Sequence, residues 1–197
     1  MKKDDIPFNM EYSIDLSLRE KAQDEGAMRQ GVKFLKEKLS EETDDFSAAT
    51  LLSMIGTYQR ILIELSESED AFKEAIEKYK KSGKKAHALG AKLRLAVTYQ
   101  WKKGFVEADK IFVETIVKLE NTEETKLQHY LDFAHQHYGK SLFEQYRNEV
   151  ALDNFVAALE LRLAFGDMKL IEDTQNCIVK TKEAIAYREK ELLVDEE

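Results

Sequence analysis

The stretch LAVTYQWKKGFVEADKIF, from Leu95 to Phe112, contains the residues that decide the fold. Small and aromatic side chains recur in it at fixed intervals: Ala96 precedes Gly104, and Ala108 and Phe112 follow it. A small residue in one helix lets the next helix approach closely, and an aromatic residue four positions after a second small residue fills the groove between helix pairs. The stretch therefore predicts two antiparallel helices joined by a tight turn at Gly104.

A second copy of this pattern follows at Gly139, Ala151 and Phe155. Ala151 comes 12 residues after Gly139, the same interval that separates Ala108 from Ala96. Two copies in the same register predict a helical repeat rather than an isolated helix pair.

An earlier and weaker copy combines Gly56 with Ala75 and Tyr79. Gly56 and Ala75 lie 19 residues apart, seven more than in the other copies, which is nearly two helical turns. Because the residues before Leu65 are apolar, the excess predicts a lengthened helix from Phe46 to Leu65 rather than a long loop.

The composition favours long helices joined by short turns. The chain of 197 residues has one proline and eight glycines, with 35% charged and 43% hydrophobic residues, and a sheet protein would need more turn residues. Apolar periodicity predicts an all-α fold in a single domain. The expected segments are an irregular lead-in at 1–12, helix pairs at about 13–39, 46–82, 86–119 and 124–165, a capping helix at 168–192 and an acidic tail at 193–197, the domain spanning 13–192.

Over roughly residues 46–165 the chain resembles the tetratricopeptide-repeat superfamily, in its irregular bacterial form. The alternative is another α-solenoid or an unrelated α-bundle. The resemblance implies a right-handed α-solenoid of about eight helices in antiparallel pairs. It also implies that the first helices of successive pairs line a concave groove that binds a peptide or protein. The groove residues are then Arg60, Leu93, Val97, Gln100, Trp101, Phe133, Gln136, His137, Lys140 and Phe143, with Thr50, Ser53 and Thr57 beside them.

The net charge of −8 argues against nucleic acid as the main ligand, because that interaction depends on basic surfaces. No long apolar segment predicts a membrane anchor or signal peptide, so the chain is expected to be cytoplasmic. We expect it to be a monomer or a homodimer. Cys177 is the single cysteine, and a buried packing role is expected for it.

No pattern in the sequence predicts catalysis or a cofactor. His129, His135 and His137 are spaced by six and two residues, whereas a metal pair on one helix needs a spacing of three or four. Phosphate-binding loops, nucleotide fingerprints and nucleophile elbows do not occur. The leading hypothesis is a non-enzymatic adaptor or regulatory scaffold that binds protein. The alternatives are an acidic immunity protein or chaperone that neutralises a basic protein and, more remotely, a self-assembling structural protein.

Overall fold

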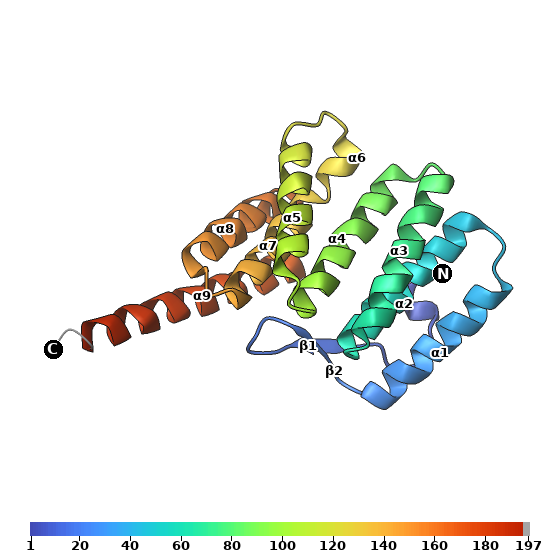
Figure 1. The fold of residues 1–197 in the computed structure, drawn as a ribbon, viewed down its shortest axis with the longest axis horizontal. Coiled ribbons are helices and arrows are strands. Elements are labelled where there is room, and N and C mark those ends of the chain that lie inside the picture. Colours follow the sequence, from blue (N-terminus) through green and yellow to red (C-terminus); the bar gives the residue numbers. More distant parts are fainter. Residues whose placement is uncertain (195–197) are drawn as a thin grey trace. The chain divides into compact units, whose positions relative to one another are not determined.

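The computed structural model describes residues 1–194, and describes side-chain surroundings for 1–124 and 127–191. Apart from a short hairpin, the described chain is all-α (Figure 1), which confirms the predicted fold class. The helices group into two compact units, Met1–Ile111 and Phe112–Glu197, where the sequence predicted one domain. Each unit is described by itself below.

The first unit begins with a single 3-10 turn and an antiparallel hairpin, which four helices follow. Its elements are η1 (Lys3–Asp5), β1 (Tyr12–Ile14), β2 (Glu20–Ala22), α1 (Glu25–Glu41), α2 (Asp45–Ile61), α3 (Leu65–Lys81) and α4 (Lys85–Trp101). Helix α5 (Phe105–Glu120) contains the boundary between the units. The second unit continues with α6 (Thr125–Gln128), α7 (Leu131–Glu144), α8 (Asn148–Phe165) and α9 (Met168–Val194).

Eight of the described helices have 14 residues or more, as the sequence predicted, and consecutive helices pack as adjacent pairs in a solenoid-like arrangement. The predicted bounds of the pairs at 46–82 and 86–119 differ from the observed ones by only a few residues. The first helix of the expected pair at 124–165 is interrupted between α6 and α7. Of the expected acidic tail, 193–194 belong to α9 and 195–197 lie outside the described residues.

The predicted helix pair at 13–39 is wrong in its first half, which forms the hairpin. Tyr12 pairs with Ala22, and Ile14 pairs with Glu20. The loop is closed by Asp15, whose carboxylate accepts hydrogen bonds from the backbone amides of Ser17 and Arg19 at 2.8 and 2.9 Å. Such local bonds offer the backbone an alternative to the helix.

Four helix-to-helix turns have the same backbone geometry. Each has three residues, and the middle one has a positive φ angle: Ile63 (64°), Gly83 (71°), Lys103 (65°) and Tyr146 (59°). The amide after the middle residue bonds back to the preceding helix, as from Glu64, Lys84, Gly104 and Arg147 at 2.8 to 3.0 Å. Gly83 provides the left-handed position just after α3, next to the predicted end of the pair at 46–82. At Gly104, the left-handed position falls one residue earlier, on Lys103.

The first repeat copy has a different register from the predicted one. A Cβ added at Gly56 would lie 3.0 Å from the ring of Phe72, so Phe72, rather than the predicted Tyr79, is the aromatic residue that packs on this glycine. Ser68, which lies between Gly56 and Phe72 in the sequence, is buried and donates a 2.7 Å hydrogen bond to the Gly56 carbonyl. Gly56, Ser68 and Phe72 have the same spacing as Gly139, Ala151 and Phe155. The predicted extension of the helix to Leu65 is therefore wrong, since α2 ends at Ile61.

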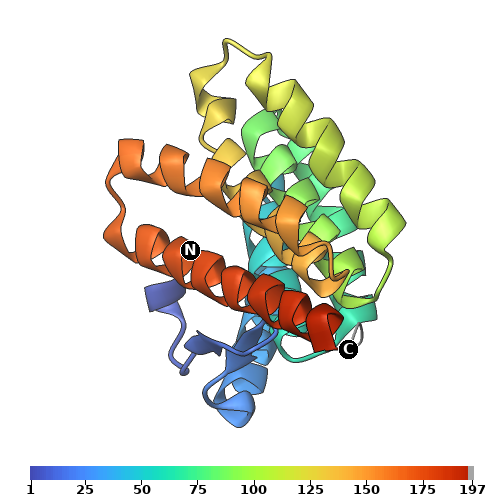
Figure 2. The same ribbon diagram turned by 90° about the vertical axis from the view of Figure 1, so that its left-hand side faces the viewer.

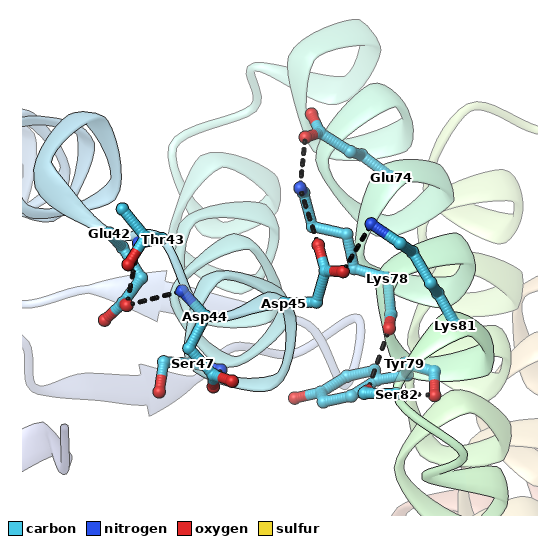
Figure 3. A network of polar contacts seen from close by, with 10 residues as sticks. All are labelled: Glu42, Thr43, Asp44, Asp45, Ser47, Glu74, Lys78, Tyr79, Lys81 and Ser82. Carbon is cyan, nitrogen blue, oxygen red and sulfur yellow. Dashed lines mark hydrogen bonds and ion pairs between the residues drawn. The ribbon is translucent and has the colours of Figure 1, made fainter.

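Charged residues connect the start of α2 with the end of α3 (Figure 3). Asp44 caps α2 by accepting a 2.8 Å bond from the amide of Ser47. The carboxylate of Asp45 contacts Lys81 at 2.6 Å and Lys78 at 3.4 Å. The hydrogen bond from Lys81 holds the pKa of Asp45 below its usual value. Carboxylates at a helix N-terminus and cations at a C-terminus also complement both helix dipoles.

In the second unit, α8 and α9 lie side by side and antiparallel (Figures 1 and 2). Arg162 of α8 is buried and joins three helices. It donates to Asp132 of α7 at 2.8 Å, and to the Leu170 carbonyl and the Thr174 hydroxyl of α9 at 3.0 and 2.6 Å. The buried guanidinium of Arg162 therefore links α8 to both α7 and α9 through hydrogen bonds.

Candidate functional site

The predicted groove residues of the first unit are buried rather than exposed on an open wall. Their exposed fractions are 3% for Arg60, 0% for Leu93, 1% for Val97, 2% for Gln100 and 4% for Trp101. These side chains therefore do not form an open surface in this structure. Their role in binding a partner stays a prediction.

The hairpin covers part of this predicted surface. The guanidinium carbon of Arg19 lies 5.0 Å from the centroid of the Trp101 ring, and that of Arg60 lies 5.3 Å from the same ring. Glu20 accepts a 3.2 Å bond from Nη2 of Arg60, and both side chains are almost fully buried. Guanidinium groups stack favourably on indole, and a desolvated contact of this kind is worth about 2 kcal/mol. A segment of this chain is therefore held on the same residues that the sequence assigned to a ligand.

Tyr58 of α2 lies near the start of the hairpin, within electrostatic range of Tyr12 and Glu11. Its ring is 6% exposed, and burial raises the pKa of Tyr58 to about 12, with the nearby Tyr12 and Glu11 contributing in the same direction. The hairpin is thus close enough to Tyr58 to affect its ionisation. We call the surface formed by Arg60 and Trp101, which Arg19 and Glu20 cover, the Arg60–Trp101 face.

The Arg60–Trp101 face has buried polar atoms without partners. Nε and Nη1 of Arg60 have no hydrogen-bond partner among the described residues, and neither has Oε1 of Gln59. A buried donor without an acceptor costs about 1–3 kcal/mol. The guanidinium could therefore donate to a further carboxylate or carbonyl oxygen, in addition to its bond to Glu20.

A separate hollow of about 250 Å³ lies beside α1. It is lined by Arg29, Val32, Lys33, Lys36, Leu62 and Glu64. Arg29 forms an ion pair with Glu64 across it. The hollow is basic and shares no residue with the predicted groove.

The predicted residues of the second unit come together on one side of α7. Gln136, His137 and Lys140 are 3%, 8% and 9% exposed, and Phe133 and Phe143 are half-buried. The rings of Phe133 and His137 stack with their centroids 4.1 Å apart. Gln136 donates to the sulfur of Cys177 in α9 at 3.3 Å. Helix α9 therefore contacts this side of α7, as the next first helix of a repeat array would.

Cys177 has the expected properties of a packing residue. It is 3% exposed, and burial raises the pKa of its thiol. A protonated, buried thiol is a poor nucleophile and a poor metal ligand. In the described part of the chain, no three His, Cys, Asp or Glu side chains gather where they could hold a metal ion. Nor is any described helix both long and apolar enough to cross a membrane.

Comparison with known proteins supports the fold only. No protein-family model and no curated protein sequence matches the chain. Among solved structures, it is similar to the crystal structure of BtubC (BKLC) from P. vanneervenii, with a TM-score of 0.51 and 14% sequence identity. The match covers 85% of this chain and 76% of that one. At this identity the likeness indicates a helical-repeat fold and nothing about activity or partners.

The hairpin residues that complete the face were not among the predicted site residues. A signal for them was present: Tyr12, Ile14, Leu16 and Leu18 alternate with polar residues, which is the period of a strand. This alternation ends at Leu18, so it indicates the strand but reaches Arg19 and Glu20 only as the residues that follow it. Leu18 is 1% exposed and has a φ angle of 62°, so the loop holds an apolar residue inward at a strained position.

Proposed function

We propose that this chain is a non-enzymatic, tetratricopeptide-like module of the cytoplasm that binds an extended segment of another protein. The observation that carries the proposal is the hairpin on the Arg60–Trp101 face, where Arg19 and Glu20 contact Trp101 and Arg60. The first helices of neighbouring pairs, α2 and α4, together supply an aromatic ring and a cation to an extended backbone. Aromatic and arginine anchors dominate the energy of most protein interfaces.

The second unit contributes a similar set of groups to the proposal. The half-buried Phe133 and Phe143 present aromatic surface on α7, whereas Gln136 and Lys140 beside them are almost fully buried. Aromatic residues are enriched at protein interfaces. We therefore assign binding to both units, without assuming a shared groove.

Capture of partners from a lysate of the source cells tests this function. The wild-type chain, Phe133→Ala and Phe143→Ala would be compared with Val156→Ala, a control at an exposed position of α8. A partner lost with both phenylalanine variants and retained by the control supports the proposal. Identical captured proteins in all four samples would remove α7 from the binding surface. Circular dichroism would verify that each variant keeps its helix content.

A further inference from the structure

We propose that the hairpin is an internal ligand, and that the Arg60–Trp101 face exchanges it for a carboxylate-bearing extended segment of the partner. This inference rests on the proposed function and specifies its partner. The segment that would replace the hairpin carries an acidic side chain opposite Arg60. Glu20 occupies that position in the closed form of the molecule.

The charge of the face selects an acidic ligand. Arg60 is 3% exposed, and its contact with Glu20 is the ion pair that balances it. Removing the hairpin without replacement would take away the carboxylate that pairs with Arg60 and the Arg19 contact with Trp101. The face therefore favours an incoming segment that supplies a carboxylate of its own.

The hydrogen-bonding capacity of Arg60 favours exchange over a permanent closure. Its Nε and Nη1 atoms have no partner among the described residues in the closed form, although a guanidinium presents donors for two parallel bonds to one carboxylate. A partner whose carboxylate reaches Nη2 and Nε together would satisfy more donors than the 3.2 Å contact to Nη2. The internal ligand is thus a suboptimal one, which an external ligand can displace.

The hairpin also has features of a separable segment. Its two strands have three residues each, and all three side chains of β1 are exposed. A two-stranded hairpin is marginally stable alone, so its order depends on the face that it covers. Leu18 is held at a positive φ angle, and release of the loop would relieve this strain.

Trp101 provides the measurement, because it is the single tryptophan of the chain. The probe is a synthetic peptide of residues 10–23, and its binding is followed by tryptophan fluorescence and by acrylamide quenching. The hosts are the full-length wild-type chain and the full-length Glu20→Gln chain. In the wild type the tethered hairpin competes at an effective concentration in the millimolar range, about that of short linkers.

We expect the peptide to bind the Glu20→Gln chain at least about 10-fold more tightly than the wild type, since hydrogen bonds to charged groups have this magnitude. The same substitution in the peptide should weaken its binding to that host by about 10-fold. A Lys21→Gln peptide is the matched control and should bind like the unmodified one, because Lys21 is the exposed residue of β2.

Hydrogen exchange supplies a second readout that does not depend on the peptide. The ladder amides of β1 and β2 should exchange faster in the Glu20→Gln chain, while those of α3 keep their wild-type rates. Equal affinity of the unmodified and Glu20→Gln peptides, equal affinity of the two hosts, or unchanged exchange of the hairpin would each overturn the inference. Partner capture that still depends on Phe133 would then leave the proposed function standing without the exchange.

Discussion

The guanidinium carbon of Arg60 lies 5.3 Å from the ring centroid of Trp101, across the 41 positions that separate them in the sequence. These two residues end neighbouring first helices, α2 and α4, and the hairpin reaches both. A cation against an indole ring at this distance is stabilising, and its burial excludes competing water. The cation and the indole ring of the Arg60–Trp101 face therefore both lie near the C-terminal ends of their helices.

Tyr58 should make the stability of the first unit sensitive to alkali. Its pKa is about 12 in the folded chain and 10.0 without the protein environment. Because the pKa is raised in the folded chain, the stability that protonated Tyr58 contributes is fully present below pH 10 and is lost as the pH rises to about 12. Because one pKa unit corresponds to about 1.4 kcal/mol, the loss is about 2–3 kcal/mol.

Urea unfolding, followed by Trp101 fluorescence at pH 9 and pH 11.5, would measure this loss. The Tyr58→Phe variant lacks the ionisable group and should lose less stability between these values than the wild type does. Tyr146→Phe, at an exposed position, is the control and should behave like the wild type. A Tyr58→Phe variant with the wild-type pH dependence would contradict the assignment.

Substitution of Gly139 by alanine should destabilise the second unit. The added Cβ would lie 2.7 Å from the ring of Phe155, a distance that forces the helices apart. Overpacking of this kind costs about 1–3 kcal/mol. The rate at which Cys177 reacts with a thiol reagent in urea reports opening of this unit, and it should increase.

Two other glycines calibrate that result. Gly56→Ala should cost less, since the nearest ring atom of Phe72 would lie at 3.0 Å. At Gly26, the nearest atom is a side-chain oxygen of Asp24 at 3.4 Å. Gly26→Ala should therefore be neutral or stabilise by up to about 1 kcal/mol through helix propensity. Equal changes in stability at all three positions would show that helix propensity, rather than packing, determines the effect of these substitutions.

The helix-to-helix turns predict opposite effects for two substitutions at equivalent positions. Gly83→Ala places a Cβ in open space but at a φ angle of 71°, so only backbone strain acts. Stability should fall by about 1–2 kcal/mol. Lys103→Gly relieves the same strain at 65° and should stabilise by up to about 1 kcal/mol. Thermal unfolding would measure both, and a destabilised Lys103→Gly chain would refute this account of the turn.

The ion pair between Arg162 and Asp132 should show strong coupling. Both side chains are at least nine-tenths buried, so Arg162→Met leaves Asp132 without its cation. Breaking a buried pair costs about 3–5 kcal/mol. The double variant Arg162→Met with Asp132→Asn removes both charges and should be more stable than the single variant. Additive losses in a double-mutant cycle would instead mean that the two side chains act independently.

Most helices could be predicted from the sequence because each carries an apolar stripe with helical period. The end of α2 could not, since Leu62 and Ile63 form a turn without glycine or proline. Leu62 is 6% exposed, so its apolar character reflects burial rather than helix. The predicted register of the first repeat was wrong because Ser68, a polar residue, takes the position that alanine has in the other copies.

The candidate site was predictable only in part. The sequence assigned Arg60 and Trp101 to successive first helices, and the structure brings the two side chains together. It did not predict their burial, because the covering residues Arg19 and Glu20 are far away in the chain. Contacts between distant segments depend on tertiary packing, which local periodicity does not encode.

The boundary between the two units falls within α5, which runs from Phe105 to Glu120, rather than in a loop. A helix cut at Ile111 would lose the hydrogen bonds that cross the cut and expose new unpaired amides and carbonyls at its ends. This affects how the protein can be divided for study. A fragment designed to isolate the Arg60–Trp101 face should keep the whole of α5 and end after Glu120.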